Sequence, residues 1–275
     1  MSLVEKALRK LQVGAPRGPA PTPAPGLGRR LAATVINPSV LRSAGFLPPA
    51  HEERQLAQQY RRIKRPLIAK AFGRGVPQAP NGRLILVTSA MAGEGKTFTS
   101  LNLALSLARE KDVHVLLVDA DVAKPNISRS LGVAEAPGLL DALRDAGKDV
   151  EGLIRPTDVS NLFVLPTGTA SKEATELLAS QRMGQVAAAL LKRDPQRIVL
   201  FDSPPLLQTT ESHALTQIAG QIVVIVRAES TPQPVLFDAL KLIEGHPAVS
   251  LVLNQSTESA TSAYYYHGYG DDRAD

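Results

Sequence analysis

The chain has 275 residues, a net charge of +5 and no cysteine. This length and an apolar content of 44% are enough for one sizeable core. The lack of cysteine excludes disulfides, a thiolate metal site and a Cys nucleophile. We find no apolar run near the roughly 18 residues of a membrane span, and no signal peptide. We therefore expect a cytoplasmic protein.

The charge is unevenly distributed along the chain. Residues 1–80 hold 14 Lys and Arg against 3 Glu, whereas residues 81–275 hold 17 Lys and Arg against 23 Asp and Glu. A basic segment can attract nucleic acid or anionic lipid. Because its charges lie among prolines and helical stretches without interleaved aromatic residues, we expect no nucleic-acid binding.

The N-terminal segments are predicted to lie outside a packed core. In residues 1–13, Ser2 and Glu5 have the spacing of a capping box, and Leu8 and Leu11 lie on one face of an amphipathic helix. This helix is either a frayed terminus or a docking element for a partner. Residues 14–28 contain five Pro and four Gly, so we assign residues 14–50 to a Pro/Gly-rich linker.

Residues 51–81 are predicted to form a basic helical segment. Leu56, Tyr60 and Ile63 recur at helical spacing on one stripe, with basic residues around them. Pro66 is expected to kink or end this helix.

Short apolar runs then alternate with segments of helical length. Such runs are typical of parallel strands that are buried on both faces. We predict an α/β domain with a mainly parallel sheet over residues 82–254, followed by a flexible Tyr-rich tail over residues 255–275. The expected strands are residues 84–87, 113–118, 162–165, 198–201, 222–226 and 249–253.

The first expected strand leads into a P-loop at residues 90–97. Gly93 and Gly95 let backbone N–H groups approach phosphates, and the following helix adds its positive N-terminus. Lys96 can reach the β and γ phosphates, and the Thr97 hydroxyl can bind Mg²⁺. Ala90 replaces the usual first glycine. The alternative is an ordinary strand-to-helix turn with a solvated lysine.

Three carboxylates follow two other expected strands. Asp119 and Asp121 come after the second strand, and Asp202 after the fourth. Either group alone could be a helix cap. Ligands bind at the carboxyl ends of strands in an open α/β sheet, so the three together predict a site that holds Mg²⁺ and orients a nucleophile.

These motifs, with a C-terminal cluster of four of the five tyrosines, resemble the bacterial tyrosine kinases. Residues 1–8 and 60–67 further resemble the exosortase-associated tyrosine autokinases of exopolysaccharide gene clusters. The resemblance implies a P-loop NTPase domain of the MinD/ParA-like fold that uses ATP and Mg²⁺. It also implies autophosphorylation of the tail, at Tyr264, Tyr265, Tyr266 and Tyr269.

The resemblance also assigns roles to the site residues. Asp119 is expected nearest the acceptor hydroxyl, where a base helps because free Tyr has a pKa near 10. The expected catalytic residues are Lys96, Asp119, Asp121 and Asp202; the Mg²⁺ ligands are Thr97, Asp121 and Asp202; and the ATP-binding residues are Gly93, Glu94, Gly95, Lys96, Thr97, Phe98, Arg227 and Asn254.

The tail can reach beyond its own subunit. Ten residues separate Asn254 from Tyr264, an extended reach of up to roughly 35 Å. The alternative is an aromatic tail that packs on the core. The resemblance implies three partners: further copies of the chain, a tyrosine phosphatase, and a membrane polysaccharide co-polymerase or chain-length determinant that activates the kinase at the inner face of the membrane.

The chain departs from the family pattern at two positions. Gln59 replaces the Glu of a Glu-x-x-Arg-x-x-Arg oligomerisation motif, and Ala123 replaces an Arg after the second Asp of residues 119–121. Both changes weaken the expectation of a subunit ring.

Two other functions stay open. One is a MinD/ParA-like regulatory ATPase, although Met91 stands where those proteins have a second P-loop lysine. The other is an ATP-binding adaptor of a polysaccharide-export complex.

Overall fold

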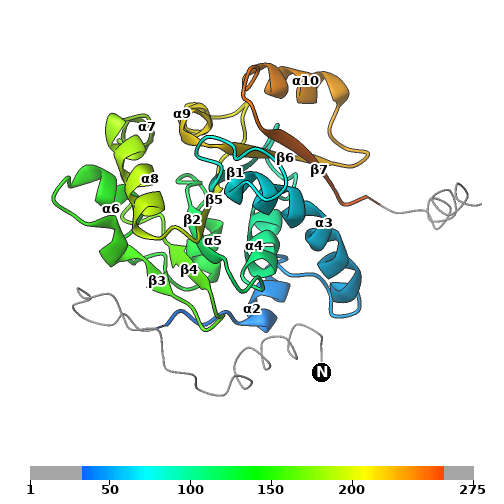
Figure 1. The fold of residues 1–275 in the computed structure, drawn as a ribbon, viewed down its shortest axis with the longest axis horizontal. Helices are drawn as coiled ribbons and strands as arrows, with labels where there is room; N and C mark the ends of the chain where they lie inside the picture. Colours follow the sequence, from blue (N-terminus) through cyan, green and yellow to red (C-terminus); the bar gives the residue numbers. More distant parts are fainter. Residues whose placement is uncertain (1–32, 257–275) are drawn as a thin grey trace, which may run out of the picture.

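The structure is a computed structural model that describes residues 33–256. A seven-stranded sheet lies between two layers of helices (Figure 1). Its strand order is β3-β4-β2-β5-β1-β6-β7, and every pair is parallel except β3 with β4. The strands are β1 (Leu84–Ser89), β2 (His114–Asp119), β3 (Arg155–Pro156), β4 (Leu162–Leu165), β5 (Arg197–Asp202), β6 (Gln221–Arg227) and β7 (Val249–Asn254).

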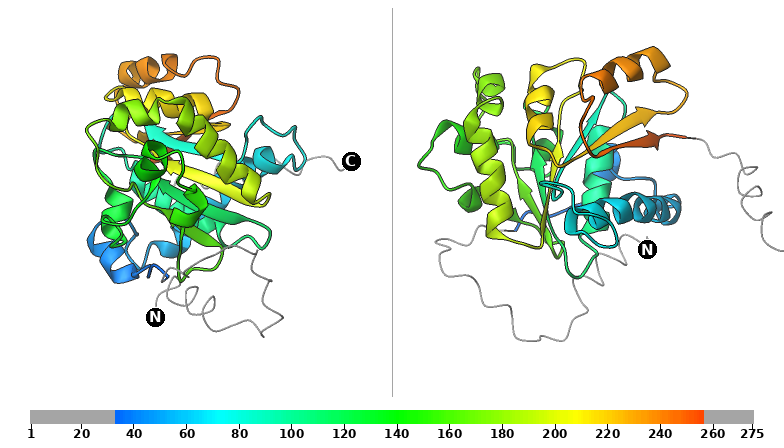
Figure 2. Two further views of the ribbon diagram at one scale, coloured as in Figure 1. Left: turned by 90° about the vertical axis from the view of Figure 1, so that its left-hand side faces the viewer. Right: turned by 45° about the horizontal axis from the view of Figure 1, so that its top comes forward.

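Alternating side chains of each central strand enter two cores. In β1, Ile85 and Val87 enter one core, and Leu84 and Leu86 enter the other. The helices of the first layer are α2 (Pro38–Ser43), α3 (Glu53–Phe72), α4 (Lys96–Leu107) and α5 (Asn126–Ser130). The second layer holds α6 (Leu139–Arg144), η1 (Val150–Leu153), α7 (Ala174–Leu178), α8 (Gln181–Arg193), α9 (Thr210–Ile218) and α10 (Gln233–Lys241) (Figure 2).

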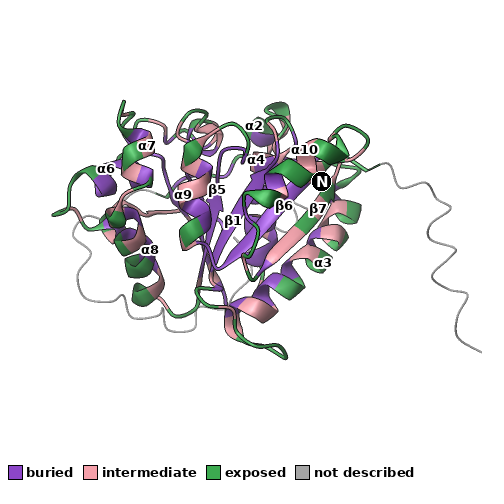
Figure 3. Cartoon of the chain, turned by 90° about the horizontal axis from the view of Figure 1, so that it is seen from above, coloured by how far each residue is buried: buried purple, intermediate pink, exposed green. Residues whose placement is uncertain are grey.

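The predicted α/β fold and all six expected strands are confirmed. The expectation that every strand is buried on both faces is wrong for β7. Leu251 and Leu253 are 53% and 60% exposed, because β7 is an edge strand that the surrounding helices only partly cover (Figure 3). Strand β3 was not predicted, since two residues show no periodicity.

The predicted linker is wrong for its last part. Residues 34–47 pack on the domain, with Ile36, Leu41 and Leu47 buried in the same core as the P-loop helix. Asn37 caps α2 by accepting hydrogen bonds from two backbone N–H groups, and Pro38 fits the first turn. The prolines and glycines that suggested a linker are concentrated in residues 14–28. The apolar side chains that pack on the domain lie outside this stretch, so its composition did not predict their burial.

Helix α3 does not end at Pro66 but continues to Phe72. Buried Lys64 ties this helix to α4: its Nζ donates to the Ser106 carbonyl at 2.7 Å and pairs with Glu110 at 2.7 Å. Packing against α4 therefore offsets the backbone hydrogen bond that proline removes. The helix ends at Gly73 in the left-handed conformation that glycine favours.

Several predictions lie outside the described residues. They are the helix at residues 1–13, the first part of the linker and the tail that contains Tyr264, Tyr265, Tyr266 and Tyr269. Between residues 33 and 256, no helix combines the length and the apolar character needed to cross a membrane.

Candidate active site

The P-loop joins β1 to α4 at the carboxyl edge of the sheet. Gly93 and Gly95 have φ angles of +86° and +93°, which residues with a Cβ rarely adopt. At Gly95 an added Cβ would also lie 2.0 Å from Nδ2 of Asn254, so the end of β7 packs directly on the loop. Helix α4 begins at Lys96 and directs its N-terminal N–H groups toward this loop.

Lys96 is buried at the start of α4, with 8% of its surface exposed. Burial lowers the pKa of its ammonium group, and the nearby carboxylates of Asp202 and Asp121 oppose this effect. A desolvated lysine beside exposed backbone N–H groups is suited to binding phosphate oxygens, because it loses little further hydration when the phosphate arrives.

Asp202 is fully buried at the end of β5 and fixes two hydroxyl groups of α4. Thr97 Oγ1 donates to its Oδ2 at 2.8 Å, and Ser100 Oγ donates to its Oδ1 at 2.9 Å. Burial raises the pKa of Asp202 to about 6, although these two hydrogen bonds favour the charged form. The role of Ser100 in holding Asp202 was not predicted from the sequence. Its position about one helical turn after Thr97 was the available signal.

Asp119 lies opposite Asp202 in the β2–β5 register and is also fully buried. Its Oδ2 accepts hydrogen bonds from Ser128 N and Ser128 Oγ, both at 2.7 Å. Its Oδ1 has no hydrogen-bond partner within the described part of the chain. Burial, followed by the charge of Asp202, raises the pKa of Asp119 to about 7. This carboxyl group can therefore hold a proton near neutral pH.

Of the three carboxylates, Asp121 lines the cleft, and Asp119 and Asp202 do not. Its Oδ1 accepts a hydrogen bond from Lys124 N at 3.0 Å, and burial raises its pKa. Residues 33–256 contain no group of three or more His, Cys, Asp or Glu residues arranged to hold a metal. Mg²⁺ needs only one or two protein carboxylates beside substrate phosphates and water, so Thr97, Asp121 and Asp202 fit the ion.

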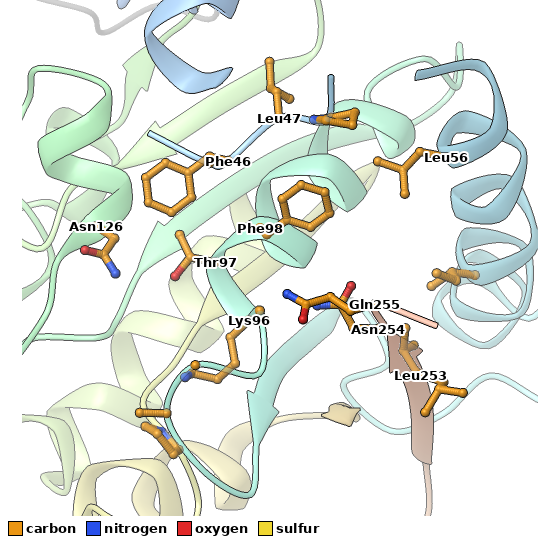
Figure 4. A pocket seen from close by; sticks show the side chains of 18 of the residues that line it. Phe46, Leu47, Leu56, Lys96, Thr97, Phe98, Asn126, Leu253, Asn254 and Gln255 are labelled. Atoms are coloured by element: carbon orange, nitrogen blue, oxygen red, sulfur yellow. The ribbon is translucent and has the colours of Figure 1, made fainter. Parts of the chain in front are cut away.

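An open cleft of about 1470 Å³ extends from the P-loop to α3 and the end of β7 (Figure 4). It brings together seven of the predicted residues: Gly93, Gly95, Lys96, Thr97, Phe98, Asp121 and Asn254. The outer wall of the cleft was not predicted from the sequence. It includes Phe46, Leu47, Leu56 and Gln59 from the N-terminal segment. The apolar residues 46–47 were the available signal, but they were assigned to the linker.

Four predicted residues do not line the cleft. The buried Asp119 and Asp202 lie beneath it, and Arg227 is exposed at the end of β6. Glu94 is 2% exposed, with its side chain hydrogen-bonded to Met91 N and Thr231. Direct contacts of Arg227 and Glu94 with ATP stay predictions.

Residues 82–244 match the family model described as an AAA domain, which is more than half of the chain. The chain belongs to the AAA-domain family. The match begins just before β1 and covers the P-loop, the three carboxylates and strand β6 of this AAA-domain protein.

The chain is also similar to bacterial tyrosine kinases, which confirms the resemblance drawn from its motifs. It is 30% identical over 193 residues to the tyrosine-protein kinase Wzc of Salmonella typhimurium, covering 70% of this chain and 26% of Wzc. The kinase domain of VpsO has a TM-score of 0.62 and 26% identity, covering 76% of this chain and all of that domain. The AAA-domain protein thus spans about a quarter of the length of Wzc.

The fold is shared with nucleotide-binding proteins outside the kinases. MinD of Pyrococcus horikoshii, solved with Mg-ADP, has a TM-score of 0.53 and 26% identity, and covers 65% of this chain and 72% of MinD. This likeness confirms the expected P-loop fold.

Proposed function

We propose that the AAA-domain protein is an ATP-dependent protein-tyrosine autokinase that phosphorylates Tyr264, Tyr265, Tyr266 and Tyr269 and regulates exopolysaccharide biosynthesis or export. The observation that carries this proposal is the geometry in which Asp202 orients the Thr97 hydroxyl beside Lys96, in a fold shared with kinase domains. Such a site is suited to binding a nucleoside triphosphate and a divalent cation, both of which a phosphoryl-transfer reaction requires.

ATP binds with its phosphates on the P-loop. Lys96 and the loop N–H groups would contact phosphate oxygens, and Thr97, Asp121 and Asp202 would hold Mg²⁺ directly or through water. When bound, Mg²⁺ neutralises charge on the transferring phosphoryl group. Phe98 and Asn254, which line the cleft where it continues to α3, would contact the base of the nucleotide.

The acceptor tyrosine approaches from the open side of the cleft. Asp121 lines the cleft, whereas Asp119 lies deeper with one oxygen unpaired among the described residues. The proton released by the tyrosine would be held on Asp119, which is not among the proposed Mg²⁺ ligands and whose pKa is raised to about 7, chiefly by burial. The earlier expectation that Asp119 is nearest the acceptor stays a prediction.

The proposed partners are further copies of this chain, a tyrosine phosphatase and a membrane polysaccharide co-polymerase that recruits the kinase to the inner face of the membrane. Gln59 and Arg62 of the expected subunit-contact motif line the nucleotide cleft. This placement supports delivery of the tail from one subunit to the site of another.

The second candidate is a regulatory ATPase, which the similarity to MinD favours. Such an enzyme transfers the γ-phosphoryl group to water, so its turnover would not need the tyrosines. Met91, in place of the second P-loop lysine, argues against this candidate.

Phosphopeptide mass spectrometry of the full chain with ATP and Mg²⁺ tests the proposal. We expect phosphate on Tyr264 to Tyr269 in the wild type and in Lys192→Ala, a control at an exposed position of α8. Lys96→Ala should abolish it, because the variant loses the phosphate-binding ammonium group. An unmodified tail in the wild type, both alone and with the cytoplasmic part of a co-polymerase, contradicts the proposal.

A further inference from the structure

Glu94 lies between the two P-loop glycines, and its side chain is buried. P-loops bind phosphate mainly through backbone N–H groups, and a carboxylate beside them repels the ligand. Glu94 is nevertheless 2% exposed, and its charge lies close enough to Lys96 to influence the pKa of that lysine. A buried carboxylate at this position requires a structural reason.

The carboxylate of Glu94 connects the loop to a different part of the sheet. Its Oε2 accepts a hydrogen bond from Met91 N at 2.8 Å, within the P-loop itself. Its Oε1 accepts a hydrogen bond from the hydroxyl of Thr231, which in turn accepts one from Arg227 N at 3.0 Å. The side chain of Glu94 thus joins the start of the P-loop to the turn that follows β6.

The main chain of Glu94 is held from a third direction. Its carbonyl accepts a hydrogen bond from Asn254 Nδ2 at 2.9 Å, at the end of β7. The same amide lies against Gly95 so closely that no side chain fits there. The loop is therefore held by the turn after β6 and by the end of β7, while Gly93 and Gly95 line the cleft.

We propose that Glu94 is a positioning residue for ATP, which holds the P-loop in its phosphate-binding conformation by linking Met91 to Thr231. The inference rests on the proposed nucleotide site. A loop that is already ordered loses less conformational entropy when the ligand binds, so the link contributes to ATP affinity and not to the transfer step. Thr231 is the other member of this link.

The test is a double-mutant cycle on the full chain, with MgATP affinity measured by displacement of a fluorescent ATP analogue. Thr231→Val removes the hydroxyl, and Glu94→Met keeps the length of the side chain but removes both acceptor oxygens. Each change should weaken MgATP binding by roughly tenfold, as expected for a hydrogen bond to a charged group. The double variant should also lose roughly tenfold, because both changes break the same link.

Two controls separate positioning from general damage. Thr231→Ser keeps the hydroxyl and should retain wild-type affinity. Thr157→Val removes a hydroxyl that bonds Val159 and Leu162 carbonyls at the opposite end of the sheet, and should leave affinity unchanged. In steady-state autophosphorylation, KM for ATP should rise in Thr231→Val while kcat stays within about twofold.

Several results would overturn the inference. If Glu94 acted through its charge, Glu94→Met would tighten ATP binding and Thr231→Val would have no effect. A multiplicative loss of roughly a hundredfold in the double variant, or weak binding by Thr231→Ser, would also refute the link. The readout is independent of the proposed kinase activity, because tight MgATP binding without tail phosphorylation would contradict only the latter.

Discussion

At the scale of single residues, the site depends on carboxyl groups removed from water. Asp119 and Asp202 are both fully buried on adjacent strands, and the charge of Asp202 adds to the effect of burial in disfavouring ionisation of Asp119. The sequence predicted both residues directly after their strands, and the structure has each as the last residue of its strand. The sequence could not show that Asp119 lies beneath the cleft wall, because burial depends on Ser128 and other residues distant in the chain.

The raised pKa of Asp119 predicts a dependence of stability on pH. Between about pH 4 and pH 7 the folded state binds more protons than the unfolded state, so the free energy of unfolding falls as pH rises. Asp119→Asn lacks this titration and keeps an oxygen for the Ser128 hydrogen bonds. Relative to the wild type, it should gain stability as pH rises through this range.

Urea unfolding of the nucleotide-free protein at about pH 5 and about pH 7.5 measures this effect. The exposed substitution Asp112→Asn serves as the control and should show no such gain. A difference between Asp119→Asn and the wild type that is the same at both pH values would show that Asp119 does not titrate in this range.

At the scale of elements, local patterns predicted the strands and the P-loop but not the packing of less regular segments. The apolar runs and the glycine spacing are properties of neighbouring residues, so they could be identified directly. The burial of residues 34–47 and the continuation of α3 beyond Pro66 depend on contacts with α4. Such tertiary contacts override composition and propensity.

The position of Pro66 predicts a stabilising substitution. Pro66 is exposed in the interior of α3, where it lacks a backbone donor and crowds the carbonyl of the preceding turn. Pro66→Ala should raise the free energy of unfolding by about 1–3 kcal/mol. Pro38→Ala at the first turn of α2 should not, because proline is compatible with that position.

Chemical denaturation measures both variants. An equal effect of the two substitutions would show that Pro66 does not strain α3. The change in the free energy of unfolding would then arise in the unfolded chain.

At the scale of the whole molecule, the nucleotide cleft joins parts that are distant in sequence. The P-loop, the N-terminal residues 45–63 and the end of β7 all line it, and the tail follows directly after β7. The N-terminal segment is thus part of the cleft wall, although residues 45–50 were assigned to the linker and only the residues from 51 onward to a helix. In the sequence, the tail has an excess of acidic residues and residues 1–80 have an excess of basic residues. Each phosphate on a tail tyrosine would add a charge of about −1.5 to −2.

The fate of the γ-phosphoryl group of ATP tests the central claim most directly. We would incubate the full chain with γ-labelled ATP and Mg²⁺ and measure label on the protein and label released as inorganic phosphate, beside a chain truncated after Ser256. The account predicts label on the peptide with Tyr264 to Tyr269, and none on the truncated chain. Label released only as inorganic phosphate, at the same rate from both chains, would contradict a tyrosine kinase and identify a regulatory ATPase.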